Sequence, residues 1–223
     1  MRFLFHAQAG ESSLVLGGAD SAALHIKALR LQAGSRVNLR NLADDNLYEY
    51  EIALLDRRKA VLNLLSSRRE IVLGGGGALA WFVTDPKTIE KTLPFLNELG
   101  VGKLNLVWGE RSQGNFRLDL TRFDRIVAAS CEQCGRSRKM IVAEAKLADL
   151  TSASADLAVL DFGGEVLTSS NKTRIANKTI VIGAEGGFGA RDLELLTPFP
   201  KFSLGGALIL RSETAAIYAA TLI

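Results

Sequence analysis

The chain has 223 residues, of which 48% are hydrophobic and 23% charged, and its formal net charge is +3. This length predicts one or two domains, and such a composition can form a core that needs no disulfides. With two cysteines and two histidines, a disulfide framework is excluded and a multi-ligand metal site is disfavoured, so we predict no metal. The sequence contains no run of about 18 uncharged apolar residues. It also turns polar too early for a signal peptide, and we therefore expect a cytoplasmic protein.

The positive charge is unevenly distributed. Residues 103–146 carry nine Lys/Arg against five Asp/Glu, whereas residues 147–223 carry six against eight. Arginine outnumbers lysine by 17 to 10, and its planar guanidinium suits phosphates and base edges. The pattern is compatible with RNA on one side and a small molecule on the other, while solvated surface charge remains an equal alternative.

The first 70 residues predict a small β-barrel domain. Short strands are expected at 14–16, 36–39, 48–52 and 60–64, where apolar residues alternate or run between Gly, Asn and Asp. One helix is expected from Asp20, a suitable N-cap, to Leu31. Four consecutive glycines, Gly74 to Gly77, then predict a linker over residues 71–77.

Residues 78–223 predict a second, α/β domain. Apolar strands are expected at 79–83, 104–108, 157–160 and 179–182, and Trp81 and Trp108 should lie in the core. Helices are expected at 85–99, 119–134, 191–196 and 212–222, with Asp85 and Ser212 as N-caps. Continuous apolar strands between amphipathic helices predict a mostly parallel sheet covered on both faces.

The stretch from Ile182 to Phe188 follows a buried strand and precedes a helix, the position at which α/β sheets bind ligands. It lacks the lysine and hydroxyl of a phosphate loop and contains Glu185, which would repel phosphate. A cationic or hydroxylated ligand fits better, and the alternative is a tight strand–helix turn. A second glycine-containing stretch, residues 202–215, places Arg211 and Glu213 at the start of a helix, for which a capped terminal helix is the alternative.

These two stretches resemble the bacterial ribosomal RNA small-subunit methyltransferase E family of the SPOUT superfamily. The family pattern Ile-Gly-Pro-Glu-Gly-Gly-Phe matches residues 182–188, with Ala184 in place of proline. The pattern Leu-Gly-x-x-Ile-Leu-Arg-x-Glu-Thr-Ala matches residues 206–215, with Gly205 where leucine is usual. Further matches, in the same order as in the family, lie at residues 25–30, 97–101, 110–112 and 132–136.

The resemblance implies a PUA-like β-barrel that helps to hold RNA, followed by an α/β domain with a trefoil knot. It implies a homodimer formed through the knot region, and S-adenosylmethionine as the methyl donor. The substrate would be one uridine of 16S ribosomal RNA, in free RNA or in the 30S subunit, methylated at N3. Three loops would bind the donor: a turn at residues 161–164, the loop from Gly183 to Gly187, and the loop from Leu204 to Leu210.

The candidate site residues follow from these motifs. Arg211 would stabilise negative charge on the uracil carbonyls, and Glu185 or Glu213 would accept the N3 proton or orient the donor. For Glu213, a carboxylate that favours the helix start is an equal alternative. Candidate donor-binding residues are Leu160, Phe162, Gly163, Ile182, Gly183, Glu185, Gly186, Leu204, Gly205, Gly206, Leu208, Ile209 and Leu210. Candidate RNA-binding residues are Arg2, His25, Lys27, Arg30, Arg111, Ser112 and Arg136.

Other readings of the sequence remain open. Cys131 and Cys134 form a single C-x-x-C at a helix end, for which packing is favoured over redox chemistry or metal binding. A non-catalytic RNA-binding or ribosome-assembly factor of the same fold is one rival function. A nucleotide-binding α/β enzyme is another, which the missing phosphate-loop lysine disfavours.

Overall fold

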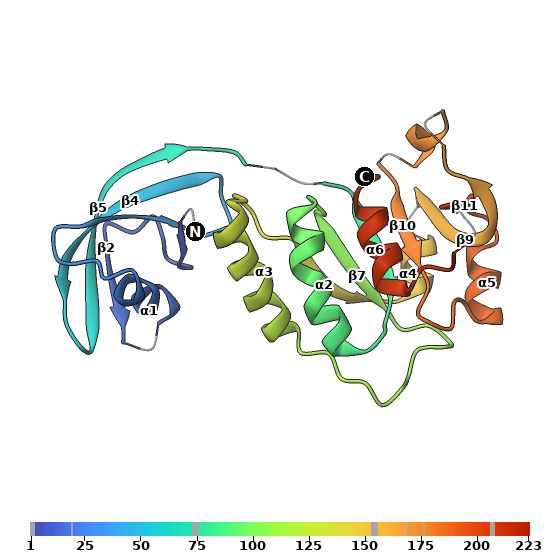
Figure 1. Cartoon of the computed structure of the whole chain (residues 1–223), viewed down its shortest axis with the longest axis horizontal. Helices are drawn as coiled ribbons and strands as arrows, with labels where there is room; N and C mark the ends of the chain where they lie inside the picture. Colours follow the sequence, from blue (N-terminus) through green and yellow to red (C-terminus); the bar gives the residue numbers. More distant parts are fainter. Residues whose placement is uncertain are drawn as a thin grey trace. The chain divides into compact units, whose positions relative to one another are not determined.

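The computed structural model describes residues 3–18, 20–72, 76–152, 156–168, 170–175, 177–205 and 208–223. The chain forms two compact units (Figure 1). The N-terminal unit comprises Met1–Gly74 and Ala128–Lys139, and the C-terminal unit comprises Gly75–Val127 and Met140–Ile223. None of the helices in the described ranges has both the length and the apolar content that crossing a membrane requires.

The N-terminal unit is built on a sheet with the order β1-β3-β4-β5-β2 in its described part. Antiparallel pairing joins β3 to β4, β4 to β5 and β5 to β2, whereas β1 runs parallel to β3. The four strands and one helix predicted here are all present, with longer strands than expected. The elements are β1 (Leu4–Phe5), β2 (Ser13–Gly17), α1 (Ser21–Ala28), β3 (Arg36–Arg40), β4 (Asn46–Leu55) and β5 (Lys59–Arg69).

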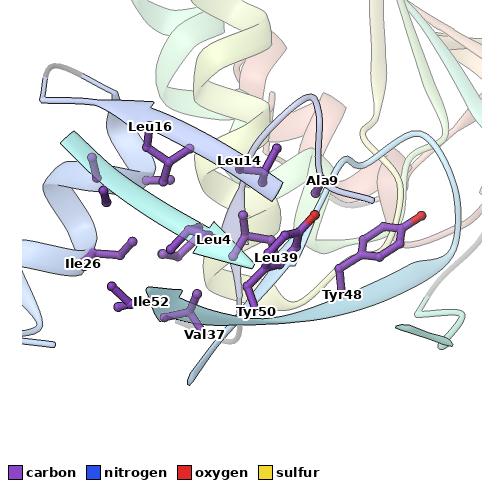
Figure 2. Close-up of a cluster of buried hydrophobic side chains, with 14 residues drawn as sticks. Leu4, Ala9, Leu14, Leu16, Ile26, Val37, Leu39, Tyr48, Tyr50 and Ile52 are labelled. Carbon is purple, nitrogen blue, oxygen red and sulfur yellow. The ribbon is translucent and has the colours of Figure 1, made fainter. Parts of the chain in front are cut away.

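Alternating apolar side chains of these strands form one core with helix α1. Figure 2 shows Leu39 of β3 and Tyr50 of β4 gathered with Leu14 of β2, and Ile26 approaching from α1. The hydroxyl of buried Tyr50 donates to the Glu11 carbonyl at 2.7 Å and accepts from the Gly10 amide at 2.9 Å. The core therefore also fixes the loop that leads into β2.

Helix α1 begins where the sequence predicts and ends earlier. The Asp20 carboxylate accepts from the Ala22 amide at 3.0 Å, which confirms Asp20 as the N-cap. The helix ends at Ala28, and Arg30 then adopts a left-handed φ of 55°. This turn redirects the chain before the expected end at Leu31.

The second half of α3 (Leu120–Cys134) belongs to the N-terminal unit, although the predicted division places it in the second domain. The buried Glu132 carboxylate accepts from the Phe5 amide at 2.6 Å. His25 Nδ1 of α1 lies 3.9 Å from the same carboxylate. The family match at residues 132–136 therefore contributes a buried residue, Glu132, to the packing of this unit.

The C-terminal unit is an α/β structure with a sheet of the order β11-β9-β10-β6-β7-β8, in which every described pair is parallel. The predicted strands correspond to β6, β7, β9 and β10, whereas β8, β11 and α4 were not predicted. The elements are β6 (Ala78–Phe82), α2 (Pro86–Glu98), β7 (Lys103–Val107), β8 (Ile141–Ala145), α4 (Leu147–Ser152), β9 (Leu157–Val166), η1 (Lys172–Arg174), β10 (Thr179–Ile182), α5 (Ala190–Leu196), β11 (Lys201–Ser203) and α6 (Ser212–Ala220).

Helices cover both faces of this sheet, as the apolar strands predict. Ala80 and Phe82 of β6 pack in one cluster with Leu147 of α4 and Leu196 of α5. Trp81 points to the opposite face, where α2 and α6 lie side by side (Figure 1). The Asp85 carboxylate accepts from the Thr88 amide at 3.0 Å, so the predicted N-cap of α2 is confirmed.

Residues 73–75 of the predicted linker lie outside the described residues, but Gly76 and Gly77 belong to the C-terminal unit. A Cβ atom on Gly76 would overlap the Gly100 carbonyl oxygen, and the Gly102 amide donates to the Gly77 carbonyl at 2.9 Å. Close backbone packing, and not flexibility, therefore requires glycine at position 76.

The buried Glu132 carboxyl makes the stability of the N-terminal unit depend on pH. Burial raises its pKa, while the Phe5 amide and His25 lower it by smaller amounts. Because the folded-state pKa is raised, the charged form costs stability above that pKa, and the cost disappears on acidification. We expect Glu132→Gln to be more stable than the wild type at pH 7.5, with an advantage that shrinks at pH 5. Urea unfolding at both pH values measures it.

The matched control for this experiment is Glu49→Gln, which removes a half-buried surface carboxylate 3.5 Å from Arg36. Its effect on the free energy of unfolding should stay below about 1 kcal/mol at both pH values. A Glu132→Gln variant that is less stable than the wild type at pH 7.5 would contradict the assignment.

Candidate functional site

A cavity of about 420 Å³ lies among three segments of the C-terminal unit. The segments are residues 160–162 of β9, residues 182–188 after β10, and residues 202–212, which lead from β11 to α6. Ligands of parallel α/β sheets bind beyond the carboxyl ends of the strands, where this cavity lies. The lining residues include Leu160, Phe162, Ile182, Gly183, Ala184, Glu185, Gly187, Phe188, Leu204, Gly205, Leu208, Ile209, Leu210, Arg211 and Ser212.

The segment after β10, residues 183–189, is called the glycine loop below. It turns sharply, because the Gly187 amide donates to the Ala184 carbonyl at 2.9 Å and Gly187 has a φ of +70°. A side chain at position 187 would be strained in this conformation, so glycine is required there. The turn places Glu185 at the cavity, where its carboxylate accepts from the hydroxyl of Thr84, just beyond β6.

Ser212 connects the glycine loop to the sheet. Its hydroxyl accepts from the indole N–H of buried Trp81 at 2.7 Å and donates to the Gly183 carbonyl at 2.5 Å. The prediction that Ser212 is the N-cap of the last helix is wrong, because Ser212 is the first residue of α6 and Arg211 is at the cap position. The tertiary contacts of the hydroxyl outweigh its local capping preference.

Arg211 and Glu213 lie on either side of Ser212. The Arg211 side chain lines the cavity and is 84% exposed, with Nη1 3.9 Å from Glu213 Oε1. Glu213 is in the first turn of α6 and is not among the residues that line the cavity. Among the described residues, the cavity is therefore lined by one exposed cation, Arg211, and by two carboxylates, Asp161 and Glu185, the second of which Thr84 holds.

Most of the predicted donor-binding residues line the cavity. Gly163 and Gly186 do not, and Gly206 lies outside the described residues. The predicted turn at residues 161–164 is wrong, because these residues continue strand β9. Pairing with β11 jumps from Val159 to Glu165, and a Cβ atom on Gly164 would lie 2.5 Å from the Phe202 amide nitrogen. Gly164 therefore lies where strand β9 is irregular and its backbone closely approaches β11, which explains why glycine occupies this position.

The predicted RNA-binding residues are not all on a surface. Arg136 is 2% exposed, and burial lowers the pKa of its guanidinium, so the prediction of an RNA contact is wrong for this residue. Arg2 lies outside the described residues. Arg30 is exposed at the end of α1, and Lys27 Nζ donates to the Arg57 carbonyl at 3.0 Å.

In the C-terminal unit, the other two predicted RNA contacts lie in the turn after β7. The Ser112 hydroxyl donates to the Val83 carbonyl at 3.0 Å and so closes this turn against the end of β6. The Arg111 guanidinium donates to the Gly186 carbonyl of the glycine loop at 2.5 Å. Both side chains therefore make internal contacts.

Sequence reasoning missed several residues near the site. Thr84 and Asp192 belong to no recognised motif, and only the position of Thr84 after a strand end could have indicated it.

Trp108 was predicted to lie in the core, but it is 38% exposed, and its indole N–H donates to Glu144 Oε2 at 2.7 Å. No group of three or more His, Cys, Asp or Glu side chains in the described part of the chain is arranged to hold a metal.

The Trp81–Ser212 hydrogen bond should contribute measurably to stability. Ser212→Ala leaves the buried indole N–H without its acceptor, so we expect the free energy of unfolding to fall by about 1–3 kcal/mol. Denaturant unfolding measures this loss. In a Trp81→Phe background, which has no N–H, the same substitution should cost less. Equal costs in both backgrounds would show that the hydrogen bond contributes nothing.

Comparisons with known proteins place these features in a family. A family model described as an RNA methyltransferase domain matches residues 78–223. Two Helicobacter pylori proteins, from strains J99 and 26695, are named ribosomal RNA small subunit methyltransferase E. They are 37% and 36% identical to this chain over 227 aligned residues, covering 100% of it and 99% of each relative.

Solved structures share the fold at lower identity. A ribosomal RNA small subunit methyltransferase E from Neisseria gonorrhoeae, bound to S-adenosyl methionine, matches with a TM-score of 0.82 at 19% identity, covering 99% of this chain and 96% of that one. The Legionella pneumophila protein Lpg2936, in complex with the cofactor SAM, matches with a TM-score of 0.82 at 23% identity, covering 100% and 97%. On the family model and the full-length relatives, this chain belongs to the ribosomal RNA small subunit methyltransferase E family of RNA methyltransferases.

Proposed function

We propose that this protein transfers a methyl group from S-adenosylmethionine to N3 of one uridine in the 16S RNA of the small ribosomal subunit. The observation that carries the proposal is the cavity of about 420 Å³, which is lined by the family's glycine-rich motifs and contains Glu185 and Arg211. The names of the full-length relatives support the substrate class, ribosomal RNA of the small subunit.

The residues of the cavity suit this donor. Leu160, Leu204, Leu208 and Leu210 provide apolar walls for an adenine ring, and Gly183 and Gly205 line the cavity with backbone and no side chain. The carboxylate of Glu185 favours a cationic ligand and disfavours a phosphate. When bound, S-adenosylmethionine supplies a methyl group activated by its sulfonium.

Uridine N3 carries a proton, so the protein has to stabilise the anion that forms when this proton leaves. The exposed guanidinium of Arg211 at the cavity can donate to the uracil carbonyls, on which the negative charge develops. Glu185, oriented by Thr84, is the proposed proton acceptor. Glu213, 3.9 Å from Arg211, is proposed to orient that guanidinium.

The N-terminal unit is proposed to hold the RNA. Its sheet and helix α1 form a single core, which fits a PUA-like β-barrel of residues 1–70 joined through residues 71–77 to the methyltransferase domain of residues 78–223. Arg30, Lys27 and half-buried His25 of this unit are proposed to contact the RNA backbone, together with Arg2.

Two further properties are proposed for the C-terminal unit. The chain returns from β11 at the sheet edge to α6 beside β6, a path that fits a trefoil knot. Phe162, Val166, Leu208 and Ile209 expose apolar side chains, which supports a homodimer formed through this region. Ribosomal RNA as substrate would place the protein in the cytoplasm.

Labelled methyl transfer to purified 16S RNA and to 30S subunits tests the proposed function. We expect label in one of these substrates, at N3 of a single uridine, after nuclease mapping and mass spectrometry. Label at another position would overturn the proposed substrate atom and leave methyl transfer intact. RNA binding without donor binding would favour a non-catalytic assembly factor, and calorimetry with S-adenosylmethionine and with ATP separates these cases from a nucleotide-binding enzyme.

Arg211→Ala should slow methyl transfer without weakening donor binding, because the proposed contact forms with the uracil anion. By analogy with the loss of one oxyanion donor, we expect kcat to fall by about 100- to 1000-fold. Single-turnover kinetics at saturating donor measure the rate, and calorimetry measures the donor affinity. A wild-type rate with unchanged RNA affinity would remove Arg211 from the proposed mechanism.

A further inference from the structure

We infer that Arg111 is a positioning residue for the donor site, because it holds the glycine loop in the conformation that lines the cavity. The inference rests on the proposed binding of S-adenosylmethionine to this cavity. It gives Arg111 a role different from the RNA contact that the sequence predicts. The contacts of Arg111 and of its two neighbours carry the inference.

Arg111 reaches across the turn of the glycine loop. Its Nη1 atom donates to the Gly186 carbonyl at 2.5 Å, a charge-assisted hydrogen bond that fixes the orientation of this peptide group. Its aliphatic stem covers the same residue, because a Cβ atom on Gly186 would lie 3.5 Å from Arg111 Cδ. Arg111 therefore contacts the turn through both its charged and its apolar atoms.

The backbone around Arg111 is itself fastened at two places. On one side, the Ser112 hydroxyl donates to the Val83 carbonyl at 3.0 Å and accepts from the Gly109 amide at 3.2 Å. This pair joins the turn of residues 109–112 to the end of β6. Arg111 thus extends from a turn that the sheet holds in place.

On the other side, Glu110 joins the same turn to the start of α5. Its amide donates to Asp192 Oδ2 at 3.1 Å, and its carboxylate accepts from the Arg191 amide at 3.1 Å. Buried Asp192 also accepts from the Gly189 amide at 2.9 Å. The far end of the glycine loop is therefore bound to the turn that carries Arg111.

The glycine loop needs such anchors because Gly183, Gly186, Gly187 and Gly189 leave its unanchored backbone many conformations. Ordering a loop before a ligand binds lowers the entropy cost of binding. Thr84 holds the Glu185 side chain, and Arg111 holds the next peptide group. Loss of the Arg111 hydrogen bond should therefore weaken donor binding and leave RNA binding by the free protein unchanged.

The test is Arg111→Met in the full-length protein. Methionine keeps most of the apolar stem and removes the hydrogen-bond donors of the guanidinium. The matched control is Arg117→Met, which alters an exposed arginine between β7 and α3. We expect Arg111→Met to raise the Kd for S-adenosylmethionine in calorimetry about tenfold, equivalent to about 1.4 kcal/mol. Arg117→Met should leave it unchanged. Filter binding of a 16S RNA fragment without donor should not distinguish Arg111→Met from the wild type.

A second readout follows the loop directly. Without ligand, the amides of residues 183–189 should exchange hydrogen faster in Arg111→Met than in the wild type, at an unchanged thermal midpoint. Arg111→Lys retains a charged hydrogen-bond donor, so it should restore part of the affinity for S-adenosylmethionine. If Arg111→Met does not fold, Arg111→Lys carries the test, with weaker donor binding and unchanged RNA binding as the expected result.

The remaining outcomes separate this inference from the proposed function. Weaker RNA binding with unchanged donor affinity would make Arg111 an RNA contact and overturn the inference. Unchanged donor affinity and unchanged exchange would overturn it as well. A wild-type protein that does not bind S-adenosylmethionine would instead overturn the proposed function, and with it the donor-binding role of Arg111. Hydrogen exchange would then still decide whether Arg111 holds the loop.

Discussion

The candidate site depends on one buried oxygen atom, the hydroxyl of Ser212. Trp81 is fully buried, so its indole N–H must find an acceptor inside the protein, and Ser212 supplies it. The same hydroxyl donates to Gly183, where the glycine loop begins. Three segments that are distant in sequence, β6, the glycine loop and α6, therefore meet at one atom. Arg211 directly precedes Ser212, so this contact also places the cation at the mouth of the cavity.

Strong local patterns predicted much of the fold. Apolar runs identified β6, β7, β9 and β10, and Asp85 followed by Pro86 identified the start of α2. Strand β8 was missed although Met140 to Ala143 form a short apolar run, and β11 was missed because it has only three residues. The assignment of residues 128–139 to the N-terminal unit depends on contacts between distant segments, such as Glu132 with Phe5, which local periodicity does not encode.

The sequence predicted part of the candidate site, and the grounds for the prediction differed from one segment to another. The position of the glycine loop after a buried strand indicated a ligand site, and the family resemblance indicated most of the cavity lining. Charge alone misled at Arg136, which is buried, because a basic residue in a sequence does not reveal its exposure. The N-cap preference of serine led to a wrong prediction at Ser212, because its hydroxyl is hydrogen-bonded to Trp81 and Gly183 instead. Thr84 had no motif at all, since its role arises only when neighbouring strands bring their ends together.

The contact between Gly189 and Glu110 limits how this sequence can change over evolutionary time. A Cβ atom on Gly189 would overlap the Glu110 carboxylate and crowd Glu110 Cβ, so even alanine at position 189 requires a rearrangement at position 110. A shorter residue at position 110 would remove the overlap with the carboxylate, but it would keep the close approach to Cβ and would leave the Arg191 amide without its acceptor. Each substitution made alone thus creates a steric overlap or removes a hydrogen bond, before a change at the other position can compensate. We therefore expect positions 110 and 189, almost 80 residues apart in sequence, either to change together or to remain unchanged.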